Sequence, residues 1–375
     1  MEIIIDPPKP DQIEISLFGP GYGEGLLLHV GNNNWLIIDS CIDPISKQPS
    51  LLEYFQKIGI DPATSVKLIV TTHWHDDHIR GLAEIYRRCE LAEFVISAAL
   101  RSEEFLTIVN ALGKRSIMET SGVHEFYDVL QILEERKVSG STSPKFATAD
   151  RLIWRENIAL EENSFLCEVY SLSPSDESIK LALEEISGIL PEERKPKTRL
   201  VAQTPNHVSV VLWVKIGDIH ILLGSDLENT TNPSTGWNVI INSKTRPQGK
   251  ACVFKIPHHG SKNADHPMIW TEMLQKDPIS MLSPFKLGKN ILPDKSDVKR
   301  ICEKSQYAFA TTNVLSKRPK FHDKTVDKTV RETVNTIRHI NPSIGHIRIR
   351  SRSTQPPIAW VVDLFQDALP LSKFY

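Results

Sequence analysis

The chain has 375 residues, of which 40% are hydrophobic and 24% are charged. These proportions are typical of globular proteins and argue against extensive disorder. The formal net charge of -2 gives no indication of a polyanionic partner, so evidence for one has to be local. The length allows one large domain with insertions or two domains.

The cysteines and the N-terminus predict a cytoplasmic protein. Five cysteines are widely spaced and lack CxxC spacing, which argues against a disulfide framework and a thiolate zinc site. The first residues lack the basic start and apolar run of a secretory signal. No stretch has the ~20 apolar residues that span a bilayer, so we expect no membrane segment.

Alternating and β-branched stretches predict strands in the first hundred residues. We expect a meander of three strands, then a fourth strand that ends in a polar His/Asp cluster, a helix and a fifth strand. In chain order these are Gln12–Phe18, Gly25–Val30, Asn34–Asp39, Lys67–Thr72, the helix Ile79–Cys89 and Phe94–Ser97.

Helical spacing from Glu103 to Lys137 predicts a helical insertion at 101–145. A helix capped by Ser175 and ending near Ile189 follows. The predicted strands of the second half are Arg151–Trp154, Cys167–Leu172, His207–Ile216, Ile219–Leu223, Ala251–Ile256, Ile344–Arg350 and Ala359–Leu364, and the predicted helices are Lys295–Glu303 and Val326–Ile340.

The segment from Thr71 to His78 places three imidazoles and two carboxylates within six positions. Histidines at i and i+2 of an extended segment point to one side, and the following Asp-His pair can face a second point nearby. Imidazole and carboxylate without thiolate favour zinc, with manganese or iron also acceptable. The alternative is an exposed polar loop, but so many titratable groups beside an apolar strand have no evident structural benefit.

This HxHxDH pattern resembles the signature of the metallo-β-lactamase superfamily, and other motifs follow in the family's order. They are Gly21 to Leu28 with Trp35 to Ser40, Gly224-Ser225-Asp226, and Pro257-His258-His259-Gly260-Ser261. Asn206 to Leu212, together with the last two motifs, is most similar to the hydrolase domain of bacterial DNA-uptake channel proteins and its free-standing relatives.

The resemblance implies an α/β fold of the α+β type, a four-layer αβ/βα sandwich formed by one domain at 1–375. In this arrangement 311–375 supplies C-terminal β/α elements. The resemblance also implies two divalent cations, Zn²⁺ with Mn²⁺ or Fe²⁺ as alternatives. It assigns His73 and His75 to one cation and Asp77 and His78 to the other, with Asp226 between them.

Two histidine assignments stay open in the sequence. A histidine of the last motif completes the second cation, and His258 is favoured over His259, whose role could instead be substrate binding or proton transfer. His207 is a candidate third ligand of the first cation, although an isolated histidine on a strand is often structural. Glu24 and Asp39 are candidates for the carboxylates that hydrogen-bond the metal-bound imidazoles, against a turn glutamate and a surface aspartate.

The resemblance implies hydrolysis of a phosphodiester in a nucleic acid or nucleotide. Two cations roughly 3.5–4 Å apart can share a water and lower its pKa toward neutrality, which makes hydroxide available for attack. Asp77, His259, Ser261 and Lys262 are the candidate catalytic residues, and the last three could assist the leaving oxygen. Each of those three could equally be a solvated loop residue.

A basic region near the C-terminus is a candidate phosphate-binding stripe. Arg348 and Arg350 alternate on a predicted strand and should share one face; Lys317, Arg318, Lys320 and Arg352 lie nearby. The alternative is a solvated strand face. Protein partners are not indicated by any motif.

Two other functions stay open: hydrolysis of a carbonyl substrate such as a lactone, thioester or lactam, and a non-catalytic binding or regulatory role. Asp226 distinguishes carbonyl hydrolysis from phosphodiester hydrolysis, because the lactamases proper have a cysteine at the corresponding position. The complete ligand set argues against the non-catalytic role.

Overall fold

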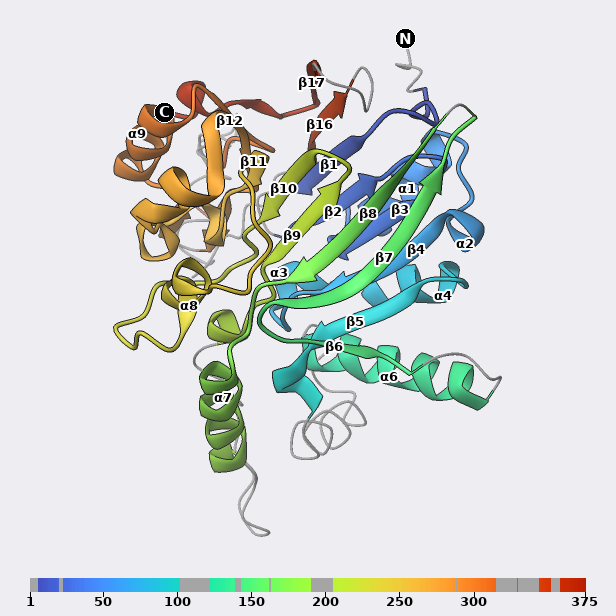
Figure 1. Ribbon diagram of the computed structural model, residues 1–375, viewed down its shortest axis with the longest axis horizontal. Coiled ribbons are helices and arrows are strands. Elements are labelled where there is room, and N and C mark those ends of the chain that lie inside the picture. Colours follow the sequence, from blue (N-terminus) through green and yellow to red (C-terminus); the bar gives the residue numbers. More distant parts are fainter. Residues whose placement is uncertain are drawn as a thin grey trace.

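Two sheets of eight strands each pack face to face, with helices on both outer faces (Figure 1). The computed structural model describes residues 6–19, 23–101, 122–138, 143–161, 163–189, 205–287, 289–314, 329, 344–351 and 358–375. The arrangement is the predicted four-layer αβ/βα sandwich. Within the described residues, no helix is both long enough and apolar enough to cross a membrane.

The first sheet has the strand order β17-β16-β1-β2-β3-β4-β5-β6. Neighbouring strands are antiparallel from β17 to β3 and parallel from β3 to β6. The strands are β1 (Glu14–Gly19), β2 (Gly25–His29), β3 (Trp35–Asp39), β4 (Val66–Thr71), β5 (Glu93–Ser97), β6 (Lys145–Ala147), β16 (Gly345–Ser351) and β17 (Trp360–Phe365).

The second sheet has the order β18-β15-β12-β11-β10-β9-β8-β7, and its strands β10, β11, β12 and β15 are parallel. Its strands are β7 (Arg151–Ala159), β8 (Ser164–Ser171), β9 (Leu212–Ile216), β10 (Ile219–Leu223), β11 (Ala251–Lys255), β12 (Leu274–Leu282), β15 (Tyr307–Ala310) and β18 (Leu369–Pro370). A separate ribbon pairs β13 (Phe285–Leu287) with β14 (Asn290–Leu292).

Helices pack on the outer face of each sheet, and an apolar cluster lies between the helices and each sheet. Against the first sheet lie α1 (Ser50–Lys57), α4 (Leu82–Arg88) and α6 (Gly122–Val138), and against the second lie α8 (Gly236–Asn242) and α9 (Lys295–Lys304). The remaining helical segments are α2 (Pro62–Ser65), α3 (Asp76–Ile79), α7 (Asp176–Ile189), η1 (Ala98–Arg101), η2 (Pro205–Val208), η3 (His258–Gly260), η4 (Lys262–Ala264), η5 (Ile269–Met273) and η6 (Leu371–Lys373).

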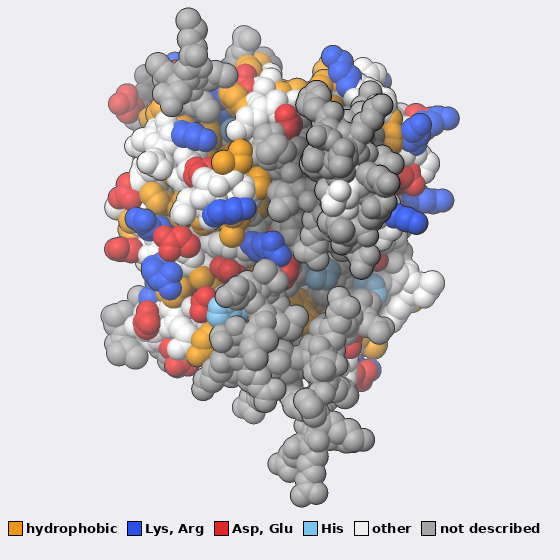
Figure 2. All heavy atoms as spheres, turned by 180° about the vertical axis from the view of Figure 1, so that it is seen from behind, with side chains coloured by type: hydrophobic (Ala, Val, Ile, Leu, Met, Phe, Trp, Pro, Cys, Tyr) orange, Lys and Arg blue, Asp and Glu red, His pale blue; other side chains and the backbone are white. Residues whose placement is uncertain are grey.

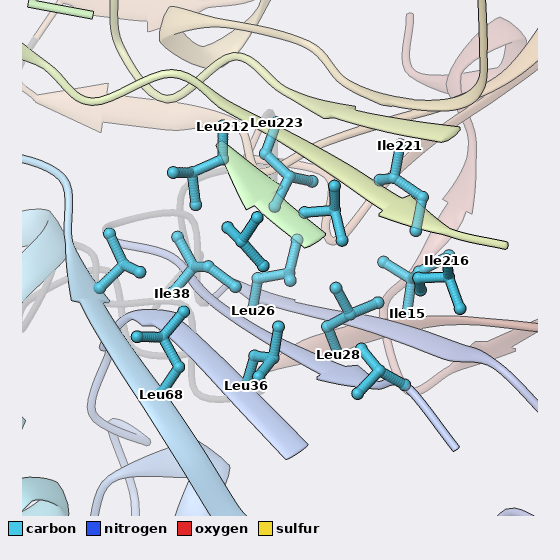
Figure 3. Close-up of a cluster of buried hydrophobic side chains, with 14 of the residues drawn as sticks. Ile15, Leu26, Leu28, Leu36, Ile38, Leu68, Leu212, Ile216, Ile221 and Leu223 are labelled. Carbon is cyan, nitrogen blue, oxygen red and sulfur yellow. The ribbon is translucent and has the colours of Figure 1, made fainter. Parts of the chain in front are cut away.

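Alternating side chains of the strands fill two different apolar layers. In β2 and β3, Leu28 and Leu36 point between the sheets, whereas Leu27 and Ile37 point toward the helices. Burial of each such side chain contributes about 1.5–3 kcal/mol relative to exposure. The layer between the sheets joins residues of both sheets (Figure 3), among them Ile15, Leu26, Leu28, Leu36, Ile38, Leu68, Leu212, Ile216, Ile221 and Leu223.

The carboxyl ends of parallel strands from both sheets meet at one edge of the sandwich. Backbone hydrogen bonds join the loops there: Val210 N donates to Thr72 O at 3.1 Å and Glu24 N donates to Asp77 O at 2.8 Å. Gly23 has a φ of 108°, and a Cβ there would lie 2.9 Å from Asp77 O, so this approach requires glycine. The edge therefore holds the HxHxDH loop in a fixed position.

Some element boundaries differ from the sequence-based predictions. The single helix predicted at Ile79–Cys89 is two helices, α3 and α4, because Gly81 adopts a left-handed φ of 82° between them. The strand predicted from His207 begins at Leu212, and His207 lies in the 3₁₀ turn η2 instead. The predictions omitted β12 and β15.

Parts of two predictions lie outside the described residues. The predicted insertion at 101–145 contributes α6 and β6, but 102–121 and 139–142 are not described. The helix predicted at Val326–Ile340 also lies outside the described residues, apart from 329. The extent of the insertion and the single domain at 1–375 stay predictions.

Candidate metal centre

His73 and His75 follow β4 and bring two ring nitrogens together. Nε2 of His73 lies 3.1 Å from Nδ1 of His75. Two imidazole nitrogens bound to one tetrahedral Zn²⁺ at about 2.0–2.1 Å lie roughly 3.3 Å apart. The pair therefore has the spacing of two ligands of one cation.

A second group joins Asp77 and His78 to two residues of the other sheet, Asp226 and His259. Nε2 of His78 lies 3.9 Å from Asp77 Oδ2 and 3.4 Å from Asp226 Oδ2. Nε2 of His259 lies 3.3 Å from Asp77 Oδ2 and 3.6 Å from Asp226 Oδ2. These distances are close to the edges of a tetrahedron of ligands around zinc.

Hydrogen bonds on the far side of each ring fix which nitrogen faces this group. Nδ1 of His259 donates to the carbonyl of Ser283 at 2.8 Å, and Nδ1 of His78 donates to Asp39 Oδ2 at 2.8 Å. Because these acceptors take the Nδ1 hydrogens, neutral rings direct their Nε2 lone pairs at the two carboxylates. Four electron-rich atoms thus converge, and their repulsion has to be offset by protons on the rings or by a cation between the atoms.

Asp39 organises both histidine pairs through Thr72. Its carboxylate accepts hydrogen bonds from the backbone N and the hydroxyl of Thr72, both at 2.7 Å, in addition to His78. Since the Thr72 hydroxyl donates to Asp39, it accepts from Nδ1 of His73 at 2.9 Å. Nε2 of His73 is therefore also free of hydrogen and directed into the site.

Burial and neighbouring charges shift the pKa values in the way a cation site requires. Burial opposes charge, but the carboxylates of Asp226 and Asp77 outweigh it and raise the pKa values of His78 and His259. The imidazoles in turn hold the pKa values of Asp77 and Asp226 below their usual range despite burial. Burial lowers the pKa values of His73 and His75.

The donors present fit a divalent metal. Nε2 of His78 is buried and has no hydrogen-bond partner within the described part of the chain. Such groups are costly to bury unless a ligand or ion compensates them. Nitrogen and carboxylate donors at these spacings suit zinc.

Lys255 is a charged neighbour that the sequence analysis did not identify. It ends β11, its side chain is 4% exposed, and its Nζ contacts Glu24 Oε1 and lies 3.8 Å from Asp226 Oδ1. Burial would lower the pKa of Lys255, but the carboxylates of Glu24 and Asp226 raise it. Glu24 is itself buried and lies 3.7 Å from Nδ1 of His78, so it is not a turn glutamate.

The structure brings His259, and not His258, to the metal-binding group. Both residues have left-handed φ values, 44° and 53°, in the tight turn η3. This backbone turns the His259 side chain inward, where it is 2% exposed, and leaves that of His258 17% exposed. The sequence favoured His258, whereas this backbone places His259 beside Asp77, His78 and Asp226; which of the two binds metal stays a prediction.

His258 belongs to a polar cluster at the rim. Its Nδ1 lies 3.2 Å from Glu228 Oε1 and 3.0 Å from Asn263 Oδ1. The amide of Asn206 donates to Glu228 Oε1 at 2.7 Å and lies 3.4 Å from His258 Nε2. Neither Asn206 nor Glu228 was predicted as a site residue; Asn206 was identified only as the first residue of the motif Asn206 to Leu212.

The remaining predicted site residues lie outside both groups of metal-binding side chains. His207 is partly buried in η2, Ser261 is partly buried after η3, and Lys262 is exposed at the start of η4. On the surface shown in Figure 2, histidine side chains lie among interspersed acidic and basic ones. The described part of that surface therefore forms no single broad basic area.

The two described arginines of the predicted basic stripe form ion pairs with carboxylates of the neighbouring strands. Arg348 and Arg350 share one face of β16, as expected, but Arg348 Nη2 donates to Asp363 at 2.8 Å and Arg350 Nε donates to Glu14 at 2.7 Å. Both side chains are only 12–13% exposed. This pairing argues against phosphate binding by these two residues; Lys317, Arg318, Lys320 and Arg352 lie outside the described residues.

Comparison with known families agrees with this geometry. A family model described as the metallo-beta-lactamase superfamily matches residues 20–230, more than half of the chain. The chain belongs to the metallo-β-lactamase superfamily. Members of this superfamily are generally metal-dependent hydrolases. A search of curated proteins gave no match.

Two solved structures with detectable similarity carry metallo-β-lactamase in their descriptions. The fold protein YhfI from Bacillus subtilis is 10% identical, with a TM-score of 0.33, over 80% of this chain and 95% of that one. A HARLDQ-motif mutant lactamase from Cronobacter sakazakii is 14% identical, with a TM-score of 0.31, over 58% of this chain and 64% of that one. This chain therefore spans less than two thirds of that lactamase's length.

Zinc binding to the metal-free protein should release protons. The raised pKa values of His78 and His259 extend the pH range over which these rings carry a proton without metal, whereas a metal ligand must be neutral. We expect protons to be released on zinc binding, measured by calorimetric titration in buffers of different ionisation enthalpy.

The pH dependence of this release has a defined sign. Release should fall as the pH rises through the two folded-state pKa values, because the rings are then already neutral. Heats of binding that are the same in every buffer at every pH tested would contradict this arrangement of imidazoles and carboxylates.

Proposed function

We propose that the protein is a dinuclear metal-dependent hydrolase that cleaves phosphodiesters of nucleic acid or nucleotide. The observation that carries the proposal is the convergence of two Nε2 lone pairs and two carboxylates from different sheets at 3.3–3.9 Å. The repulsion in this arrangement has to be offset by protons on the rings or by a cation, and the donor set and its spacing suit a divalent cation. The cytoplasmic location expected from the cysteines remains part of the proposal.

Each cation has its own donors in this proposal. His73 and His75 hold the first; Asp77, His78 and His259 hold the second; Asp226 lies between the two. His259 takes the ligand role for which the sequence favoured His258. Zn²⁺ suits the donors best, and Mn²⁺ or Fe²⁺ is compatible with them. Such a pair, when bound, supplies an ionised water and polarises a substrate oxygen.

Asp226 supports a phosphodiester substrate rather than a lactam. A carboxylate stands where the lactamases proper have cysteine. Within the described residues no thiol belongs to either metal-binding group; Cys252 contacts the carbonyl of His220 instead. The preference for nucleic acid or nucleotide rests on the resemblance of the three motifs to the DNA-uptake branch.

His258 is the residue we place against the substrate. Its Nδ1 faces two acceptors, Glu228 and Asn263, so Nδ1 carries the hydrogen and Nε2 faces the amide of Asn206 at 3.4 Å. This carboxylate–imidazole pair holds the ring in one orientation beside the metal-binding group. His258 thus takes the leaving-group role first considered for His259, and Ser261 and Lys262 follow it at the rim as contacts for the phosphate.

A substrate panel tests the proposed reaction. Zinc-loaded protein is incubated with single-stranded DNA, RNA, cyclic nucleotides and lactones, beside the double variant His75→Ala/Asp77→Ala. We expect cleavage of one or more phosphodiesters, reduced at least about 100-fold in the variant, because loss of outer-shell groups alone costs 10–100-fold.

The controls for this panel separate the alternatives. Arg87→Ala changes an exposed helix side chain and should leave the rate unchanged. Cleavage of lactones alone would replace the phosphodiester proposal with carbonyl hydrolysis. Equal rates for wild type and the double variant on every substrate would contradict hydrolysis at this site.

The histidine doublet gives a sharper test of roles. His259→Ala should lower the affinity for the second cation by at least about tenfold, because it removes a ligand. His258→Ala should keep both cations and lose turnover. Metal content after dialysis, measured by plasma mass spectrometry, separates the two; loss of metal from His258→Ala with retention in His259→Ala would reverse the assignment.

A further inference from the structure

Lys255 brings a permanent positive charge into the metal centre. Its ammonium group contacts Glu24 Oε1, donates to the carbonyl of Ser225 at 3.1 Å and lies 3.8 Å from Asp226 Oδ1. The Lys255 side chain is 4% exposed, and those of Glu24 and Asp226 are 5% and 2% exposed. A buried lysine of this kind is retained only where anionic groups compensate it.

The surroundings of the ammonium group are lined with oxygen atoms. Glu24 Oε2, Ser225 Oγ and Asp226 Oδ1 are buried without hydrogen-bond partners within the described residues. A cavity of about 20 Å³ lies beside Glu24, Ser225 and Lys255, and it is lined also by Asp39 and Thr72. This volume holds one water at most, so the charge of Lys255 is what compensates the carboxylates on this side.

The two oxygens of Asp226 therefore have different neighbours. Its Oδ2 lies 3.4 Å and 3.6 Å from the Nε2 atoms of His78 and His259, whereas its Oδ1 faces Lys255. The Lys255–Asp226 contact is an ion pair without a direct hydrogen bond, and its attraction favours the orientation in which Asp226 presents its other oxygen to a metal. Without that contact, both oxygens could turn toward the metal, since a carboxylate can bind a metal through one oxygen or through both.

We propose that Lys255 is a positioning residue of the metal centre, which holds Oδ1 of Asp226 and thereby makes this carboxylate bind metal through Oδ2 alone. The inference rests on the proposed metal binding and concerns how Asp226 takes part in it. The net charge of the centre is consistent with this role of Lys255. The centre contains four carboxylates, from Glu24, Asp39, Asp77 and Asp226. With two divalent cations and Lys255, one positive charge remains for an anionic substrate group.

Cobalt absorption reports this arrangement directly. Co²⁺ replaces Zn²⁺ in such sites, and its visible bands weaken when the coordination number rises above four. In Lys255→Met, Asp226 can bind with both oxygens, so we expect weaker visible bands than in wild type. We also expect zinc affinity to fall about 10–100-fold, as for other groups that orient ligands, measured by competition with a chelator.

A double variant keeps the test valid if Lys255→Met folds poorly. Glu24→Gln/Lys255→Met removes both charges of the closest ion pair, so it should fold more stably than Lys255→Met, yet it still frees Oδ1 of Asp226. The cobalt bands should therefore be weak in this variant too. Lys215→Met is the matched control: Lys215 pairs with Glu168 at 3.7 Å on β9, outside the centre, and its removal should leave the spectrum unchanged.

The outcomes separate this inference from the proposed function. If wild-type protein binds neither Co²⁺ nor Zn²⁺, the proposed function fails and this inference fails with it. If wild type binds both metals, but Lys255→Met or the double variant keeps the wild-type spectrum and zinc affinity, only the role of Lys255 is overturned. Weak bands in both Lys255 variants and strong bands in Lys215→Met support it.

Discussion

Four electron-rich atoms facing one another in a buried site set the main constraint on this structure. The Nε2 atoms of His78 and His259 point at the carboxylates of Asp77 and Asp226 because each Nδ1 is committed to another acceptor, Asp39 or the Ser283 carbonyl. Repulsion between such groups is strong where water is excluded. Protons offset it in the metal-free protein, and a divalent cation offsets it with better geometry.

The sandwich makes this unfavourable cluster possible. Asp77 and His78 follow β4 of the first sheet, and Asp226 and His259 follow β10 and β11 of the second, so each sheet contributes two of these four side chains. The apolar layer between the sheets stabilises their packing, and the backbone bond from Val210 N to Thr72 O ties the two edges together. Packing of the sheets therefore supplies the stability that the site itself does not.

The sequence predicted features that depend on local pattern and missed those that depend on distant partners. The HxHxDH segment, Asp226 and the alternating strands were identifiable because their chemistry or period is contained in a few residues. Lys255 ends an apolar strand and resembles an edge residue until Glu24 is brought against it. Arg348 resembled a phosphate ligand because its partner Asp363 lies on the next strand, and the order of His258 and His259 was decided by two left-handed residues.

The central claim is that side chains from both sheets hold a pair of cations. Anomalous diffraction from crystals grown with zinc, with data on both sides of the zinc absorption edge, tests it directly. The account predicts two peaks roughly 3.5–4 Å apart, one beside His73 and His75 and the other among Asp77, His78, Asp226 and His259. No peak at these residues, or a single zinc bound to His258 and Glu228 at the rim, would contradict it.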